Sequence, residues 1–249
     1  MKLKPLVSIA MTAMVALAVN NANAYAVFTG ADGNSNPNLP LTTTPLSTAA
    51  ETAFKLHLVG VGTETFETRS GSGPLALNFG AAGTATLTGN GSVASIAAGS
   101  SNAGRYSVPG GTRYWETNAG GGNFQINFSQ DIAAFGFYGI DIGDFGGTLA
   151  LQFLDDANNV ISSLNIPSAA SGADGSVLYF GAIAANDNEL FKSIRFISTQ
   201  GNGDVFAFDS FTIGAKEQVT AVPEPTSIAL LGLGLMGCAL ARRKSAKNK

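Results

Sequence analysis

The sequence has very few of the residues on which many active sites and metal centres depend. Its 249 residues include one cysteine, Cys238, and one histidine, His57. A single cysteine excludes an intramolecular disulfide. Because Cys238 lies in a C-terminal apolar run, the middle of the chain has neither a cysteine nucleophile nor a cysteine ligand for a metal. A single histidine excludes a zinc site built from several histidines, and a histidine-based triad would have to use His57.

Motifs of common enzymes are also missing. The chain has no Gly-x-Ser-x-Gly turn, no His-Glu-x-x-His pair and no phosphate-binding loop. Carboxylates such as Glu64, Glu67 and Glu116 occur in any acidic domain and do not by themselves indicate a glycosidase. His57 lies in the alternating run Lys55-Leu56-His57-Leu58, which we interpret as a surface strand. We therefore expect a protein that is not an enzyme.

Charged residues are sparse, at 12% of the chain, and unevenly distributed. Seven of the 14 basic residues lie at the two extreme ends of the chain. All 17 acidic residues fall between Asp32 and Glu224, so the middle holds 7 basic residues against 17 acidic ones, a net charge of −10. Such a domain repels nucleic acid, and we expect no nucleic-acid partner. The acidic balance favours simple solubility, with cation binding as an alternative.

The first 24 residues have the three parts of a secretory signal peptide: two lysines, a short apolar stretch and a cleavage site of small residues. Cleavage by signal peptidase is predicted by Ala22 and Ala24, so that the mature chain begins at Tyr25. Cleavage after Ala26 is an alternative. An uncleaved anchor fits less well, because the apolar stretch is short and ends in this cleavage pattern.

The C-terminal 28 residues, 222–249, also have three parts. A motif at 222–227 is followed by an apolar run at 228–241 and a basic tail at 242–249. The apolar run is shorter than the roughly 20 residues that cross a bilayer comfortably, but its glycines are tolerated in membrane helices. A basic end holds such a helix on the cytoplasmic side, which would place the preceding domain outside. The residues that carry the pattern are Val222, Pro223, Glu224, Pro225, Thr226, Arg242 and Arg243.

This C-terminus closely resembles the PEP-CTERM sorting signal of Gram-negative bacteria in all three parts and in their order. The resemblance implies recognition by a membrane-embedded exosortase, which cleaves near Pro223-Glu224-Pro225 and discards the helix. It implies a protein tethered to the inner membrane before processing and found afterwards at the cell surface or in the extracellular matrix. Such proteins usually accompany exopolysaccharide and biofilm gene sets. An ordinary tail anchor after a proline turn is the alternative.

Between these ends, apolar residues recur with a period of two, which predicts strands that bury one face. Residues 25–50 look like an irregular leader, for which we expect loose structure or one edge strand. Residues 51–214 are expected to form one antiparallel β-sandwich, and 215–221 a spacer. Asp155–Asn159 predicts the turn of a hairpin. The strands are expected around residues 54–58, 75–79, 124–128, 135–142, 149–153, 161–166, 177–180, 194–197 and 205–213.

The predicted sandwich resembles the jelly-roll domains of carbohydrate-binding modules, lectin-like or galactose-binding-like. The resemblance rests on Thr65-Phe66-Glu67 near its start and Phe208-Asp209-Ser210-Phe211 near its end. It implies neighbouring first and last strands that share a structural calcium, with Glu67 and Asp209 as carboxylate ligands completed by backbone carbonyls. The alternative is that Asp209 occupies a solvent-facing strand position.

Two further groups are candidates for binding. Asp141 and Asp144, spaced by three among glycines, could form an oxygen-ligand calcium site, or simply a wide turn after an aromatic strand. Their surroundings, residues 134–141, are similar to segments of many PEP-CTERM proteins. The other group would stack and hydrogen-bond a sugar, unless its tryptophan belongs to the core. Its members are Tyr106, Arg113, Tyr114 and Trp115.

Three functions follow from these observations. The first is a non-catalytic surface or matrix protein whose sandwich binds polysaccharide, with a structural calcium as its one expected cofactor. The second is a structural or adhesive matrix component without a sugar site. The third, a hydrolase that uses Glu116, is the least supported.

Overall fold

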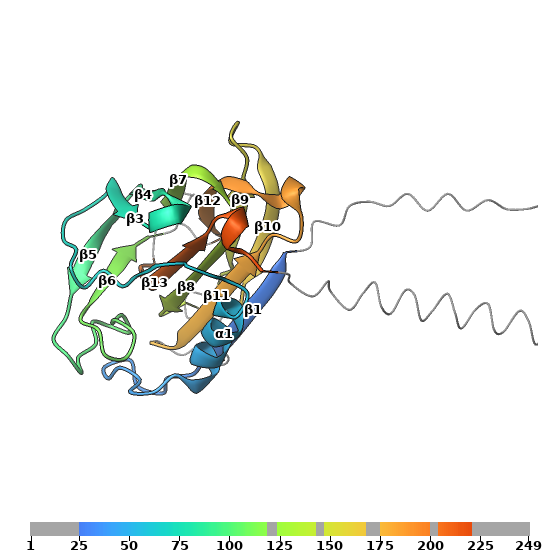
Figure 1. Ribbon diagram of the computed structural model, residues 1–249. Helices are drawn as coiled ribbons and strands as arrows, with labels where there is room; N and C mark the ends of the chain where they lie inside the picture. Colours follow the sequence, from blue (N-terminus) through green and yellow to red (C-terminus); the bar gives the residue numbers. More distant parts are fainter. Residues whose placement is uncertain (1–24, 119–123, 143–146, 168–174, 200–203, 221–249) are drawn as a thin grey trace, which may run out of the picture.

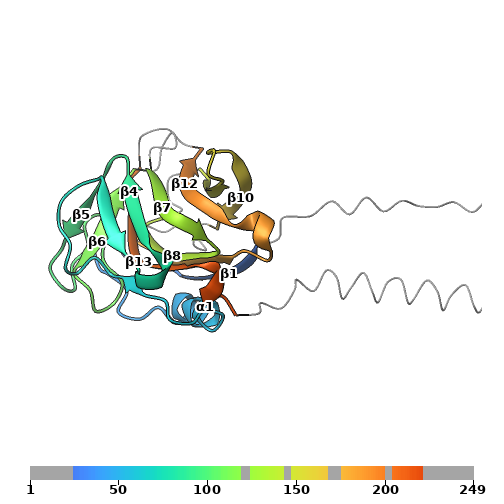
Figure 2. The same ribbon diagram turned by 45° about the horizontal axis from the view of Figure 1, so that its top comes forward.

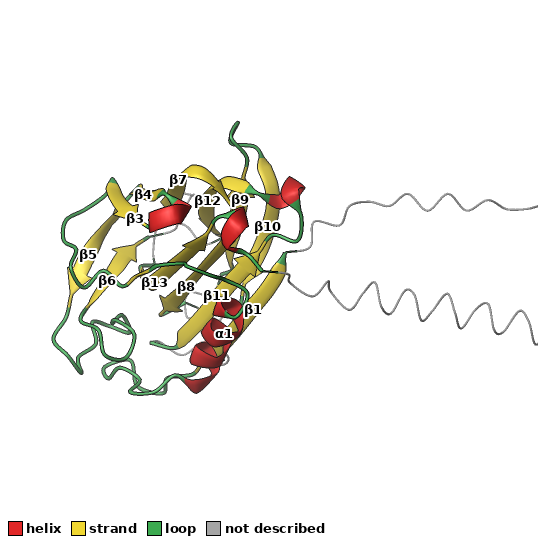
Figure 3. Ribbon diagram, in the orientation of Figure 1, coloured by secondary structure: helices red, strands yellow, loops and turns green. Residues whose placement is uncertain are grey.

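The computed structural model describes residues 25–118, 124–142, 147–167, 175–199 and 204–220. Two antiparallel sheets pack face to face (Figure 1), and strands are far more abundant than helices in the described chain (Figure 3). The predicted antiparallel β-sandwich of the jelly-roll kind is therefore confirmed. Its strand order follows from connections that repeatedly cross from one sheet to the other.

The first sheet has six strands in one path and a short seventh beside β13. In spatial order they are β1 (Ala26–Asp32), β11 (Val177–Ile183), β8 (Ala134–Ile140), β13 (Phe206–Gly214), β6 (Arg113–Thr117) and β5 (Gly91–Ser95), with β2 (Thr63–Glu64) on β13.

The second sheet has six strands. In spatial order they are β10 (Val160–Ile166), β9 (Leu149–Leu154), β12 (Phe191–Ser198), β7 (Phe124–Ile132), β4 (Thr84–Thr88) and β3 (Leu75–Asn78). The hairpin predicted between β9 and β10 is present, with residues 155–159 as its turn. Three short 3₁₀ helices complete the elements: η1 (Gly80–Ala82), η2 (Asp187–Glu189) and η3 (Lys216–Gln218).

The core between the sheets is built largely from phenylalanine. Phe137 on β8 is fully buried, and its ring lies 5.3 Å from Phe196 and 5.5 Å from Phe208 between ring centroids. On β7, β9 and β12 the core side chains alternate with partly exposed polar residues, whereas β8 and β13 are buried along their whole length. The period-two pattern of the sequence therefore identifies the core correctly for most strands.

A second apolar layer covers the outer face of the first sheet. Helix α1 (Pro45–Lys55) packs on β1 and β11, on the opposite side of the first sheet from the second sheet (Figure 2). Phe54 sits over Gly136 and Gly181, which are paired directly across β8 and β11. A Cβ atom at Gly181 would lie only 2.6 Å from the Phe54 ring, so the two glycines allow Phe54 of the helix to pack directly on the sheet backbone.

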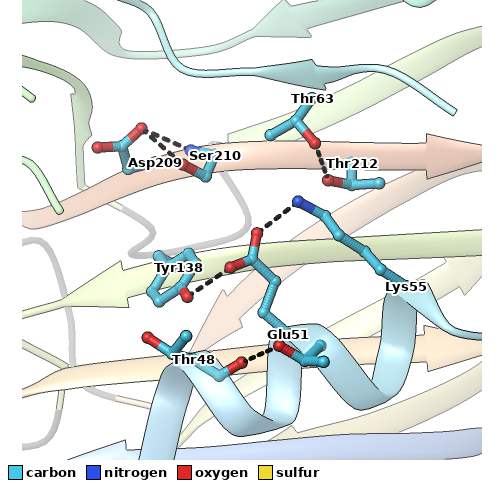
Figure 4. A network of polar contacts seen from close by, with 9 residues as sticks. Thr48, Glu51, Lys55, Thr63, Tyr138, Asp209, Ser210 and Thr212 are labelled. Atoms are coloured by element: carbon cyan, nitrogen blue, oxygen red, sulfur yellow. Dashed lines mark hydrogen bonds and ion pairs between the residues drawn. The ribbon is translucent and has the colours of Figure 1, made fainter. Parts of the chain in front are cut away.

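Polar contacts also fix α1. Its N-terminal N–H groups have no capping partner in Thr44; instead, the backbone N–H groups of Leu46 and Ser47 donate to the carboxylate of Asp32 on β1 at 3.1 and 2.8 Å. Glu51 accepts a hydrogen bond of 2.7 Å from the hydroxyl of Tyr138 on β8 and pairs with Lys55 (Figure 4). These contacts hold both ends of the helix to the sheet.

The helix corrects one prediction. Residues 54–58 were expected to form a strand with His57 on its surface, but α1 continues to Lys55 and His57 lies in the turn after it. The helix buries Ser47, Ala50 and Phe54, which have helical spacing but include only two apolar side chains, so the pattern in the sequence is weak. For residues 25–50 we expected either loose structure or one edge strand. An edge strand is present there as β1.

The last described residues return to the same corner. Val219 forms a bridge with Leu58, and the N–H of Thr220 donates to the carbonyl of His57 at 2.8 Å. The ring of His57 lies 5.4 Å from that of Phe28 on β1. The start of β1 and the residues before the C-terminal tail therefore meet at His57.

Candidate functional site

The outer face of the second sheet is the candidate functional site. Within the described residues, α1 packs mainly against β1 and β11, and no helix of comparable length covers the second sheet. The side chains that alternate with the core phenylalanines and leucines here point outward. We call five of them the polar row, because they lie in register across neighbouring strands: Thr88, Gln125, Arg195, Gln152 and Ser163.

The polar row is internally ordered by hydrogen bonds. The Nε of Arg195 donates to the side-chain oxygen of Gln125 at 3.3 Å, and the amide nitrogen of Gln125 donates to Asn127 at 2.7 Å. The hydroxyl of Thr88 donates to the carbonyl of Gln125 at 3.0 Å. These contacts hold Thr88, Gln125 and Arg195 without burying them. Ser163 is exposed, and the other four members of the row are partly exposed.

The chemistry of the polar row is that of a hydroxyl-binding surface. Amides, hydroxyls and a guanidinium supply both donors and acceptors on one face of the sheet. Such groups fix the orientation of a polar ligand, while the packed strands below keep them in place. No aromatic ring belongs to the row, so a sugar would be held here mainly by hydrogen bonds.

The aromatic residues predicted to bind sugar lie elsewhere. Trp115 is 0% exposed, and Tyr106 and Tyr114 are each 1% exposed, so the prediction that they stack on a ligand is wrong for this arrangement. Trp115 points into the inter-sheet core between Phe66 and Phe124. Tyr114, one residue earlier on β6, points to the second apolar layer, because both faces of this strand are covered.

The polar atoms of Tyr106 and Arg113 form hydrogen bonds within the protein. The hydroxyl of Tyr106 accepts from the N–H of Leu41 at 3.2 Å and donates to the carbonyl of Gly175. Burial raises the pKa of Tyr114 to about 12, so this phenol stays neutral. Arg113, the fourth member of the predicted set, is partly exposed and donates to the carbonyl of Arg69.

Glu67 and Asp209 lie in one polar cluster, as the predicted strand arrangement implies. One Glu67 oxygen accepts from the N–H groups of Thr112 and Arg113, at 2.8 and 2.9 Å, and the other from the Thr112 hydroxyl at 2.8 Å. Asp209 accepts from the Ser107 hydroxyl at 2.8 Å. A Cβ built on Gly111 would lie 2.7 Å from Glu67 and 2.0 Å from Ser107, which shows how closely the cluster is packed.

The donors around this cluster do not fit calcium. Calcium takes six to eight oxygen ligands, whereas N–H and hydroxyl donors together already occupy most of the acceptor positions of both carboxylates. Within the described residues there is no group of three or more acidic or histidine side chains arranged to hold a metal ion. The geometry supports a hydrogen-bonded link between strands, and a calcium ion at Glu67 and Asp209 stays a prediction of the resemblance.

Asp209 is 1% exposed, so the alternative prediction, that it faces solvent from its strand, is also wrong. Burial raises the pKa of its carboxyl to about 7, against the lowering effect of the hydrogen bonds from Val108, Ser107 and Ser210. The negative charge of Glu67 raises it further. Near neutral pH the buried Asp209 carboxyl is therefore protonated in some molecules and ionised in others.

Asp141 is also buried, at 3% exposure. It accepts from the N–H of Gly175 at 2.8 Å and lies 3.7 Å from the guanidinium of Arg105. Its backbone has a φ of 68°, the left-handed conformation of a tight turn. Asp144, its predicted calcium partner, lies outside the described residues.

A hollow of about 210 Å³ lies between residues 40–42 and 106–111. The side chains that line it include Tyr106, Ser107 and Pro109, and none of them is charged. It offers less binding chemistry than the polar row, and we do not assign a ligand to it.

The residues of the two sorting signals lie outside the described residues. This applies to Ala22 and Ala24 and to the motif and basic residues of the C-terminus: Val222, Pro223, Glu224, Pro225, Thr226, Arg242 and Arg243. In the part of the chain that the structure describes, every helix is too short or too polar to span a bilayer.

Comparison with known proteins confirms the C-terminal signal. Residues 221–244 match the PEP-CTERM protein-sorting motif. A search of curated proteins found no match to the chain.

Among solved structures, the K2 cleaved adhesin domain of Lys-gingipain is 13% identical, with a TM-score of 0.41, covering 62% of this chain and 99% of that one. The C-terminal family 22 carbohydrate binding module of Clostridium thermocellum Xyn10B is 16% identical, with a TM-score of 0.39 and coverages of 66% and 97%. The CBM22-1 xylan-binding domain of Paenibacillus barcinonensis Xyn10C is 12% identical, with a TM-score of 0.36 and coverages of 65% and 96%. Scores of this size establish no shared site, so the proposals below rest on this chain's own residues.

Proposed function

We propose that this protein is exported to the cell surface and that its β-sandwich binds polysaccharide through the polar row, without catalysing a reaction. The PEP-CTERM motif at 221–244 supports the route, which would use signal peptidase first and exosortase later. After exosortase cleavage, the sandwich would remain at the surface or in the matrix. The membrane is then a partner only before processing, through residues 228–241.

The observation that carries the binding proposal is the register of the polar row. Gln125, Arg195 and Gln152 are direct neighbours on three adjacent strands, and hydroxyl residues follow on either side. A surface selected only for solubility would carry charges of both signs. Here an acidic domain presents a band without carboxylates, which suits a ligand rich in hydroxyl groups.

The test uses the full chain in mild detergent and a panel of neutral and acidic polysaccharides, with retention measured by affinity electrophoresis. Replacing both Gln125 and Gln152 with alanine removes the two amides and should weaken retention about tenfold or more. Gln130→Ala is the matched control, because Gln130 lies on the same strand and donates to the carbonyl of Ala81 away from the row. Equal retention of all three proteins would contradict the proposed site.

A structural matrix role without a sugar site is the second candidate. It is favoured by the edge strands β1 and β10, which carry the exposed side chains Val27 (44%) and Val160 (49%). Open edges of this kind can pair with another sheet. This function predicts self-association that depends on protein concentration, with no retention by any polysaccharide.

A further inference from the structure

Arg195 occupies the centre of the polar row and has no carboxylate partner among the described residues. Four of the seven cationic side chains in these residues form ion pairs: Lys55, Arg69, Arg105 and Lys216. Arg195 instead donates its Nε to Gln125 at 3.3 Å. This contact uses the Nε–H group alone, and the two terminal nitrogens carry four further N–H donors.

The neighbours of Arg195 are neutral on both sides. Gln125 on β7 and Gln152 on β9 are its register partners, and Thr88 and Ser163 continue the row. The five strands that carry the row contain one acidic residue, Asp131, six positions along β7 from Gln125. No carboxylate therefore competes for the guanidinium within the row.

Arg195 lies in a domain with a net charge of −10, where carboxylates are in excess. An uncompensated cation is most stable beside carboxylates, and the protein pairs four of its seven described cations in this way. A guanidinium offers parallel N–H groups that match both oxygens of a carboxylate. A row with one such group between two amides has the chemistry to bind a sugar that carries both a carboxylate and hydroxyl groups.

We infer that the polysaccharide bound by this face is acidic, and that Arg195 pairs with a carboxylate of its sugar units. This inference rests on the proposed function and names its ligand class. Gln125 and Gln152 bind the sugar hydroxyl groups next to that carboxylate. The Arg195–Gln125 hydrogen bond orients the guanidinium before the polymer binds.

The experiment compares two forms of one polymer. Alginate is a chain of carboxylated sugars, and carboxyl-reduced alginate has the same linkages without the charge. The full chain should bind alginate at least about tenfold more tightly than the reduced polymer. Arg195→Gln should abolish this preference, and Arg195→Lys should retain part of it, because a point charge cannot form the paired contact.

The matched control is Lys192→Gln, since Lys192 lies on the same strand and donates to the carbonyl of Ser129. It should keep the full preference for alginate. Near-ultraviolet circular dichroism shows whether each variant is folded. Dextran sulfate beside dextran distinguishes a need for carboxylates from attraction to any anion: dextran sulfate bound as tightly as alginate would overturn the carboxylate assignment.

The failures of the two proposals are distinguishable. Equal binding of both alginate forms, unchanged in Arg195→Gln but weakened by the double glutamine variant, overturns the acidic ligand and leaves polysaccharide binding in place. No binding of any polymer in the panel overturns both.

Discussion

The hydroxyl of Ser107 donates a hydrogen bond of 2.8 Å to the carboxylate of Asp209, although the two residues are 102 positions apart in sequence. The contact joins the 106–111 loop to the middle of β13. The register of β13 shifts between Asp209 and Thr212, and Ser210 has a φ of 51°. Asp209 therefore anchors the 106–111 loop at the irregular point of β13. We expect the protonation state of Asp209 to affect both the loop and this part of the strand.

The raised pKa of Asp209 predicts a dependence of stability on pH. In the unfolded chain this carboxyl ionises near its ordinary value of about 4, whereas in the folded protein its pKa is about 7. Between these values the folded state holds a proton that the unfolded state has released. The free energy of unfolding contributed by Asp209 therefore falls as the pH rises from about 4 to about 7.

Asp209→Asn removes this titration, so its free energy of unfolding should change less between pH 5 and pH 7.5 than that of the wild type. The difference should be on the order of 1–3 kcal/mol, from about 1.4 kcal/mol for each unit of pKa. Urea unfolding at the two pH values measures it. Asp156→Asn, at an exposed turn position, is the control and should follow the wild type. Parallel curves for wild type and Asp209→Asn would show that Asp209 does not titrate in this range.

Trp115 should act as a core residue and not as a sugar platform. Trp115→Ala should lower the free energy of unfolding by about 3–5 kcal/mol, because it empties a site between Phe66 and Phe124. Trp115→Phe should cost less and should leave polysaccharide retention unchanged. Since Trp115 is the only tryptophan, its fluorescence reports this site alone. A shift of its emission on adding polysaccharide, without unfolding, would restore it as a ligand contact.

Asp32 should be the cap of α1. Asp32→Ala leaves the buried N–H of Ser47, 2.8 Å from the carboxylate, without its acceptor. The Ser47 hydroxyl loses its 2.7 Å contact with Asp32 and keeps only the carbonyls of Val177 and Gly30. We expect a loss of about 1–3 kcal/mol in the free energy of unfolding. Asp187→Ala is the control, because its exposed pair with Lys216 contributes less than about 1 kcal/mol. Similar losses in the two variants would argue against the capping role.

The packing of Phe54 on the sheet should require glycine at position 181. An alanine there places a Cβ atom 2.6 Å from the Phe54 ring, so either the helix or β11 must move. Gly181→Ala is expected to lower the free energy of unfolding by about 1–3 kcal/mol. Gly62→Ala has no atom within 4 Å of the added carbon and should be close to neutral. Thermal unfolding of the two variants tests the contrast.

Calcium can be tested directly at Glu67 and Asp209. Because N–H and hydroxyl donors already engage both carboxylates, we expect the melting temperature to be the same in calcium and in a chelator. A clear rise in calcium that Glu67→Gln abolishes would support the ion that the jelly-roll resemblance implies. Glu217→Gln, on the exposed side of η3, serves as the charge-matched control.

The sequence predicted the strands whose two faces differ. In β7, Phe124 and Ile126 alternate with Gln125 and Asn127, and this pattern identifies both the core and the outer face. Where a strand is covered on both faces, as in β6, the pattern disappears. Tyr114 and Trp115 then resemble exposed loop aromatics although both are buried.

The polar row could not be predicted from local sequence. Gln125 and Arg195 are 70 positions apart, and Gln152 comes from a third strand, so their proximity depends on the register of the sheet. Helix α1 was missed for a different reason. Its buried face contains the serine Ser47, and its N-terminus is capped by Asp32 from another element instead of by an adjacent residue.

The corner at His57 also determines how the domain bears force. The C-terminal sorting signal begins at residue 221, directly after the hydrogen bonds that join Thr220 to His57 and Gln218 to Val59. Tension on that end would first load these two bonds and then reach β13, which is flanked by β8 on one side and by β6 and β2 on the other. A central strand pulled along its length breaks its ladders together instead of peeling from an edge. If the C-terminal end is the point of attachment, β13 is therefore better placed to bear tension than an edge strand would be.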